Sequence, residues 1–285
     1  MSPIDYAGPG PLTTLAARHI DAAAALPHDP PGICAVVPGL VVHPLDTDDL
    51  ELSPERMAAQ SLRPVSATLD ALLAIDGADL TVERSREDRV VGTCRTFVAV
   101  ACALLRWRGI PVRARCGFGS YFQPGRHLDH WIAEYWAPDQ DRWVRVDVEH
   151  LPNSYVSRPD DLAPGEFLTG GEAWQLFRTG AVDGMTFGVG HTTDAWGPAE
   201  IRGNAIRDLA ALNCVEVLPW DNWGRMEDSY DGKTGPDYDE LIDQIAAACA
   251  DPSPAAAESM YRIPELTVPA AMLDHDTAPS SRSIT

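Results

Sequence analysis

The chain has 285 residues, and 42 acidic against 22 basic side chains give it a formal net charge of −20. Such a surface repels phosphate backbones and anionic membranes, so we expect neither nucleic acid nor a membrane as a partner. A hydrophobic content of 45% is typical of a globular protein, and the length suffices for one large domain or two small ones.

The N-terminal residues show neither the basic nor the apolar region of a secretory signal, and no apolar run is long enough to cross a bilayer. The cysteines are irregularly spaced, without a C-x-x-C pair: Cys34, Cys94, Cys102, Cys116, Cys214 and Cys249. These features predict a cytoplasmic protein with reduced thiols and no structural zinc site.

The N-terminal part is predicted to be helical. Residues 11–26 read as an alanine-rich helix that Pro27 stops. Residues 27–53 are rich in proline and aspartate and indicate extended connections. Residues 54–75 read as another helix, which Pro64 splits.

The middle of the chain predicts a helix followed by an antiparallel meander. Apolar residues recur with helical spacing from Cys94 to Arg108, and Gly109 ends that helix. Residues 112–116 alternate as in a half-buried strand, and 130–136 and 142–148 read as two further strands joined by a tight turn. This order indicates an α+β fold.

The C-terminal part is predicted to be mostly helical, with helices at 171–178, 201–213 and 238–250, the last capped by Asp237. We divide the chain into an N-terminal helical part, a catalytic core, a C-terminal extension packed on the core and a loose tail, at residues 1–84, 85–150, 151–263 and 264–285.

Cys94, His130 and Asp147 are the candidate catalytic residues. Cys94 stands at the start of its helix, where the helix N-terminus favours a thiolate. A histidine within reach takes the thiol proton, and a carboxylate on its far ring nitrogen orients the ring. His130 lies in the predicted strand 130–136 and could be this base, and Asp147 lies in the predicted strand 142–148 and could be this carboxylate.

The core resembles the transglutaminase-like superfamily. The resemblance rests on four motifs in the family's order: Gly92-Thr93-Cys94, Gly109-Ile110-Pro111, Asp129-His130-Trp131 and Trp143-Val144-Arg145-Val146-Asp147. It implies a papain-like α+β core in which Cys94 is the nucleophile, His130 the base and Asp147 the orienting acid.

The C-terminal half resembles a bacterial subgroup of uncharacterised transglutaminase-like proteins, from which no reaction is transferred. Three motifs carry this second resemblance: Phe167-Leu168-Thr169-Gly170-Gly171, Ile201-Arg202-Gly203-Asn204 and Leu218-Pro219-Trp220-Asp221-Asn222-Trp223-Gly224. The chain shows no D-x-D-x-D-G calcium loop, which disfavours calcium-dependent crosslinking.

Each candidate also has a structural interpretation. Cys94 alone would be a buried helix cysteine, and His130 a strand histidine with a local partner. His127 is the rival histidine, but the pair His127-x-x-His130 lacks a third metal ligand, so we expect no metal and no cofactor. Glu149 is the fallback carboxylate, and His150 follows it and could line the same site.

Four residues are candidates for substrate binding: Trp131, Glu149, Trp220 and Trp223. The cluster of Trp220, Asp221, Asn222 and Trp223 is more often core packing than a substrate wall, and Arg202-Gly203-Asn204 is more often a helix cap than a ligand site. The backbone N–H of Cys94 is one candidate donor for an oxyanion hole, and the sequence does not identify the second.

The sequence therefore predicts acyl transfer through a thioester on Cys94, with a small-molecule or peptide amide or thioester as substrate. Hydrolysis is the first hypothesis, because water needs no dedicated acceptor site. An amide-forming acyltransferase is the second, although an acidic surface disfavours docking to an acidic carrier protein. A non-catalytic binding module on the same fold is the third. The sequence leaves the oligomeric state open.

Overall fold

A computed structural model describes residues 4–152, 155–251 and 253–273. The chain forms two compact units. The N-terminal unit comprises Asp5–Ala114 and Ile132–Leu162. The C-terminal unit comprises Arg115–Trp131, the described residues from Ala163 onward and Ile4. In the described residues, no helix has the length and apolar character needed to cross a membrane.

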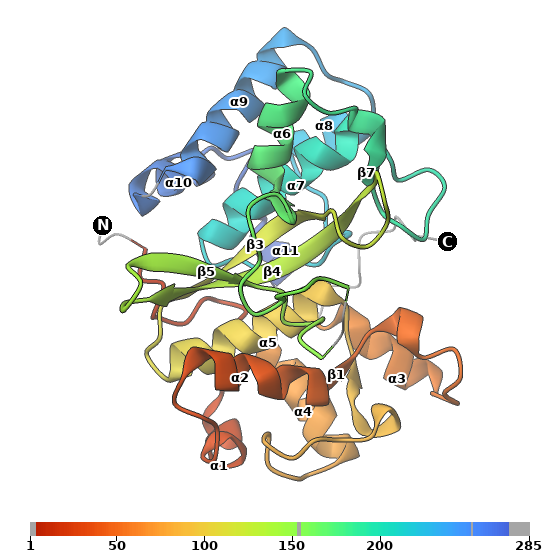
Figure 1. Cartoon of the computed structure of the whole chain (residues 1–285), viewed down its shortest axis with the longest axis vertical. Helices are drawn as coiled ribbons and strands as arrows, with labels where there is room; N and C mark the ends of the chain where they lie inside the picture. The colour runs from red at the N-terminus through yellow and green to blue at the C-terminus, as the bar shows by residue number, and fades with distance from the viewer. Residues whose placement is uncertain (1–3, 153–154, 252, 274–285) are drawn as a thin grey trace. The chain divides into compact units, whose positions relative to one another are not determined.

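The N-terminal unit is built around one buried helix, α5, which contacts α2 and α4 (Figure 1). Its α-helices are α1 (Ile20–Ala23), α2 (Pro30–Val36), α3 (Pro54–Ala58), α4 (Val65–Ile75) and α5 (Cys94–Trp107). Two short strands, β1 (Val41–Val42) and β2 (Val90–Val91), pair in parallel and bring the chain to the start of α5.

Helix α5 follows its prediction closely. Every residue of α5 except Trp107 is buried, and most of them are small or apolar. The two buried arginines, Arg95 and Arg106, donate hydrogen bonds to the Leu62 carbonyl and the Thr13 hydroxyl. Gly109 ends the helix with φ +72°, a conformation that favours glycine. Its N–H bonds the carbonyl of Arg106 at 2.9 Å, and the N–H of Ile110 bonds that of Leu105 at 3.0 Å.

The helix predicted at residues 11–26 is wrong over most of its length. Only the 3₁₀ turn Ala17–His19 and α1 are helical. The hydroxyl of Thr13 accepts a hydrogen bond from the N–H of Gly10 at 3.2 Å, and the hydroxyl of Thr14 donates to the Gly10 carbonyl at 3.0 Å. Such local side-chain bonds compete with helix formation, so the chain turns here instead.

The segment 27–53 was predicted as extended connections, and this is wrong at α2. Asp29 caps α2 by accepting the N–H of Gly32 at 2.8 Å, and Pro30 takes the first helical position. In contrast, Pro64 interrupts the predicted helix 54–75 as expected, because α3 ends before it and α4 begins after it.

The predicted meander is present, and the α+β fold class is confirmed. The sheet has the strand order β5-β4-β3-β6, and β7 pairs with β4 in parallel. The strands are β3 (Val112–Gly119), β4 (His127–Ala137), β5 (Arg142–Val146), β6 (Phe167–Thr169) and β7 (Phe187–Gly188). β4 and β5 are antiparallel, with Ala133 opposite Val146 and Ala137 opposite Arg142.

The α-helices of the C-terminal unit are α6 (Gly170–Arg178), α7 (Pro198–Leu212), α8 (Arg225–Tyr230), α9 (Pro236–Ala250), α10 (Pro254–Tyr261) and α11 (Ala270–Leu273). Helices α6, α7 and α9 pack against one another, and α7 also contacts α8 and α10 (Figure 1). A capping box starts α6, since Thr169 accepts the N–H of Glu172 at 3.2 Å and the Glu172 carboxylate accepts that of Thr169 at 2.8 Å.

Two predictions for this unit, the cap of α9 and the loose tail, differ from the structure. The cap of α9 is Gly235 and not Asp237, because Pro236 already takes the first helical position. In the segment predicted as a loose tail, the side chains of Leu266 and Val268 are buried. Residues 274–285 of that segment lie outside the described residues.

Candidate active site

Cys94 is the first residue of α5, and only 7% of it is exposed. Thr93, the N-cap residue, makes no side-chain capping hydrogen bond, so its hydroxyl does not compete for the first-turn N–H groups. No capping hydroxyl from Thr93 therefore offsets the partial positive charge of the helix N-terminus.

The glycine before the cysteine has a steric reason. A Cβ on Gly92 would lie 2.6 Å from the Cβ of Thr96, closer than side chains approach one another. Gly92 thus lets the chain turn tightly into α5, which sets the position of Cys94 at the helix start.

His130 lies in β4, and 3% of it is exposed. The rings of Phe122 and Tyr121 meet its imidazole edge-on, with centroids 5.1 Å and 6.5 Å away. Both aromatic residues belong to the connection between β3 and β4 and are half-buried. Tyr121 and Phe122 were not among the predicted site residues, although two adjacent aromatic residues just before a histidine strand are a usable signal.

Asp147 directly follows β5 and is fully buried. Its N–H bonds the carbonyl of Pro159 at 2.8 Å, which fixes the backbone. Its carboxylate faces Nδ1 of His150 at 3.1 Å and also accepts the His150 N–H at 3.2 Å. Because a carboxylate only accepts, Nδ1 of His150 carries the proton of that bond.

The register of β4 and β5 explains how His130 and Asp147 approach one another. Ala133 lies opposite Val146, so the antiparallel strands carry Asp147 toward the stretch of β4 that precedes Ala133. A ring nitrogen of His130, a carboxylate oxygen of Asp147 and a ring nitrogen of His150 lie within 4.8 Å of one another.

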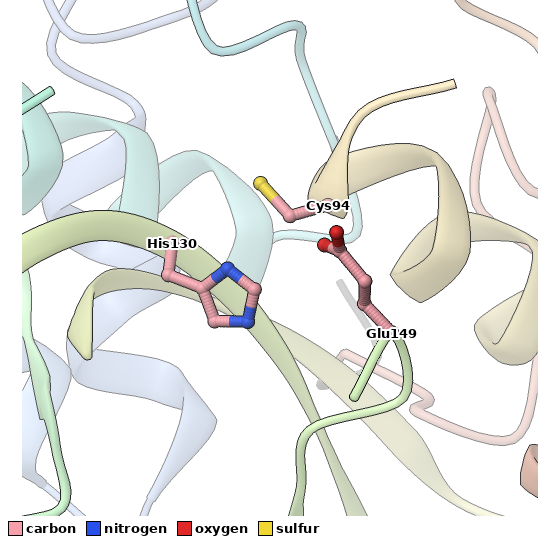
Figure 2. Close-up of side chains that lie close together, drawn as sticks. All are labelled: Cys94, His130 and Glu149. Atoms are coloured by element: carbon pink, nitrogen blue, oxygen red, sulfur yellow. The ribbon is translucent and has the colours of Figure 1, made fainter. Parts of the chain in front are cut away.

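A second group contains the predicted nucleophile. The sulfur of Cys94, a ring nitrogen of His130 and a carboxylate oxygen of Glu149 lie within 4.8 Å of one another. Figure 2 shows the thiol of Cys94 and the carboxylate of Glu149 directed toward the same space as the imidazole ring of His130. Glu149, predicted as a fallback carboxylate and a substrate contact, thus lies beside the thiol.

The two groups also bear on metal binding. Thiolate, imidazole and carboxylate are zinc ligands, so the atoms of Cys94, His130 and Glu149 form a set that zinc accepts. The same atoms are those that thiol catalysis requires. Our expectation that no metal takes part remains a prediction, which chelation tests.

The rival histidine, His127, makes separate contacts. Its ring stacks on Phe187 with centroids 4.2 Å apart and an interplanar angle of 5°, and its Nδ1 lies 3.3 Å from the hydroxyl of Thr186. Burial lowers the pKa of His127 from its usual value. These contacts give His127 a packing role next to β7.

The tryptophans predicted to touch substrate differ in exposure. Trp131 is fully buried. Trp223 is 3% exposed, and its indole N–H donates to the carbonyl of Leu266 at 3.1 Å, as a packed core tryptophan does. Trp220 is half-buried and is the tryptophan of that cluster with surface to offer.

Residues 74–148 match the family model described as the transglutaminase-like superfamily. The matched segment includes Cys94, His130 and Asp147, so the predicted resemblance is confirmed for the core. A solved structure, described as a "putative cysteine protease" from Cytophaga hutchinsonii, aligns at 14% identity and a TM-score of 0.33. That alignment covers 51% of this chain and 41% of the other, less than half of its length. No curated protein matches the chain.

Proposed function

We propose that the protein is a cysteine-nucleophile enzyme that hydrolyses an amide or peptide bond through a thioester on Cys94. The observation that carries this proposal is the grouping of a thiol at a helix N-terminus with an imidazole and carboxylates, within 4.8 Å in each group. The family match over residues 74–148 supports the same reaction class.

In the first half of the proposed reaction, His130 takes the proton of the Cys94 thiol, and the thiolate attacks the carbonyl carbon of the substrate. The carbonyl oxygen becomes an oxyanion, for which the backbone N–H of Cys94 is a candidate donor. The C–N bond then breaks, the amine leaves with the proton from His130, and the acyl group stays on sulfur.

In the second half, water gives a proton to His130 and attacks the thioester carbonyl. The C–S bond breaks, the carboxylic acid leaves, and the proton returns to the Cys94 sulfur. Asp147 orients the imidazole in this scheme, and His150 orients Asp147 through its two hydrogen bonds.

The carboxylate of Glu149 affects how easily the Cys94 thiol can lose its proton in this mechanism. A carboxylate so close to the thiol of Cys94 opposes a second negative charge, because like charges raise the cost of ionisation. The helix N-terminus and a protonated His130 act in the opposite direction. We therefore assign Glu149 to the substrate, as an acceptor for an N–H or ammonium group near the scissile carbonyl.

The test is acylation read by intact mass. The full chain is incubated with a set of amide and thioester probes, and a covalent adduct on Cys94 followed by its hydrolysis is the expected result. Cys94→Ala must form no adduct. His130→Ala should slow adduct formation by about 100-fold or more, and Asp147→Asn by less. EDTA should leave the rate unchanged.

Cys214 provides a matched internal control, because it is 7% exposed, the same fraction as Cys94, but follows a helix instead of starting one. With iodoacetamide near neutral pH, Cys94 should alkylate at least about tenfold faster than Cys214. Equal alkylation rates for Cys94 and Cys214, together with no adduct from any probe, would contradict the enzyme hypothesis and favour the non-catalytic binding module. Release of the acyl group to an added amine instead of water identifies an acyltransferase.

A further inference from the structure

The C-terminal unit contains a buried polar network that the proposed reaction does not use. Its centre is Asn204 in α7, which is 1% exposed. The Asn204 amide nitrogen donates to the carbonyl of Gly117 at 3.1 Å and to Oδ1 of Asp129 at 2.6 Å. The amide oxygen accepts from Nη1 of Arg207 at 3.0 Å. Asn204 therefore ties β3 to β4 at the residue that precedes His130.

Arg207 fixes the orientation of that amide. Its guanidinium is 4% exposed and donates to the Asp221 carbonyl at 3.3 Å and to the Asn222 side-chain oxygen at 2.8 Å. If the Asn204 amide were reversed, its NH₂ group would face the guanidinium, and two donors would oppose each other. Arg207 thus holds the donor side of Asn204 toward Asp129.

Two glycines explain why this arrangement is tight. A Cβ on Gly170 would lie 2.3 Å from backbone atoms of Asn204 and Ala205, so α6 approaches α7 at Asn204 itself. A Cβ on Gly203 would lie 2.5 Å from the Tyr230 hydroxyl oxygen. The three C-terminal motifs noted in the sequence thus supply Gly170, Asn204 and the acceptors of Arg207, which all meet in this network.

Asp129 is the point where the network reaches the proposed active site. Burial raises the pKa of Asp129, while the charge of Arg207 and the hydrogen bond from Asn204 oppose that rise. Successive side chains of a strand point to opposite faces, so Asp129 and His130 lie on different sides of β4. Asp129 consequently does not react, but its anchoring sets the place of His130.

We propose that Asn204 is a positioning residue for His130, acting through Asp129 by holding this carboxylate and the β3–β4 pair in place. The functional part of this inference rests on the proposed role of His130 as the base. The structural part, the dependence of the His130 ring on Asn204, does not.

The test uses two variants and one control in the full chain. Asn204→Ala removes the whole amide, whereas Asn204→Asp keeps its shape and the acceptor for Arg207 but loses the donor to Asp129. Asn213→Ala is the control, because Asn213 follows α7 and its amide also bridges two carbonyls, those of Leu209 and Ala257. The measurements are imidazole ¹H–¹⁵N spectra, with His130 assigned by His130→Gln, and the iodoacetamide rate of Cys94.

Asn204→Ala should shift the His130 ring signals and slow Cys94 alkylation by about tenfold, while Asn213→Ala changes neither. At high pH, Asn204→Asp should shift the His130 ring signals and slow Cys94 alkylation as Asn204→Ala does. As the pH falls, both measurements should return toward those of the wild type at the same pH. The reason is that the new carboxyl group and Asp129 then share a proton, which restores the hydrogen bond between them. The other charged or titratable groups that act electrostatically on Asp129 and its network are Arg207, Glu200, Tyr230, His130, His191, Asp194 and Cys116.

The outcomes separate this inference from the proposed function. Unchanged His130 signals in a folded Asn204→Ala variant overturn the inference. If that variant does not fold, Asn204→Asp decides, and an Asn204→Asp variant without pH-dependent recovery overturns it equally. If Cys94 in the wild type alkylates no faster than Cys214, the proposed function fails, yet the His130 spectra still test the role of Asn204.

Discussion

Breaking the buried ion pair of Arg115 and Asp208 by removing one charge should cost more stability than breaking an exposed pair of this chain. Arg115 is 4% exposed and Asp208 is fully buried. The Asp208 carboxylate accepts from Nε and Nη2 of Arg115 at 2.9 Å and 2.8 Å, and from the N–H of Cys116 at 3.0 Å. Asp208→Asn leaves a buried guanidinium without its counter-charge, which costs about 3–5 kcal/mol.

A matched control is the pair of Arg142 and Asp161, which also has two hydrogen bonds, from Nη1 and Nη2 of Arg142 at 2.8 Å each. Its side chains are 43% and 20% exposed, so Asp161→Asn should cost about 1 kcal/mol or less. Urea unfolding at constant m value compares the two variants, and Asp208→Asn should also lower Tm by about 6–20 °C.

A double variant that combines Arg115→Met and Asp208→Leu tests the cost of desolvating the two charges. Replacing both charges with apolar side chains removes the desolvation cost together with the attraction, so the double variant should recover much of the lost stability. Equal destabilisation by Asp208→Asn and Asp161→Asn would refute the argument, because burial would then make no difference to the pair.

Three further changes have defined outcomes. His150→Ala should slow alkylation of Cys94, whereas His150→Asn, which keeps a donor at the position of Nδ1, should restore part of the rate; equal rates would remove His150 from the site. Thr169→Ala should cost about 1 kcal/mol in urea unfolding, because it removes the capping box of α6. The hydrogen bond from Arg18 holds the pKa of Asp70 at about 2, below its ordinary value, so its stabilising effect is present at neutral pH and is lost as pH falls toward 2. Asp70→Asn should therefore lower the unfolding free energy slightly at about pH 6 and not at about pH 2, and the difference should shrink with salt.

The predictable parts of the fold are those in which local pattern and burial agree. Helix α5 and strands β3, β4 and β5 were predictable from the spacing of their apolar residues, because these elements pack into the buried core and therefore carry apolar side chains at regular intervals. The helix predicted at residues 11–26 is mostly absent. Its alanine content favours a helix, but two threonine side chains form hydrogen bonds with the backbone that stabilise a turn instead. Helix α2 was missed because an Asp-Pro-Pro sequence starts helices as well as loops.

The candidate site was predictable to the extent that its residues stand in recognisable local contexts. Cys94, His130 and Asp147 could each be named from a helix start or a strand motif, and the family match covers all three. His150 was expected to line the site because it follows Glu149, but its hydrogen bonds to Asp147, like the ring contact of Phe122 with His130, depend on distances that the sequence does not contain. Only the register of β4 and β5 and the path of the β3–β4 connection show what these side chains face.

The hydrogen-bond partners of Arg207 explain why so many C-terminal residues converge on one arginine. Its side chain donates to amide and carbonyl oxygens and to the Tyr230 hydroxyl, which are neutral groups. A buried guanidinium bonded to neutral groups keeps its charge available to carboxylates that it does not bind directly. Here these are Asp129 and Glu200, whose pKa values burial raises and the charge of Arg207 lowers. Arg207 thus favours the ionised form of Asp129, and Asn204 carries the hydrogen bond that fixes where that charge lies, one residue before His130.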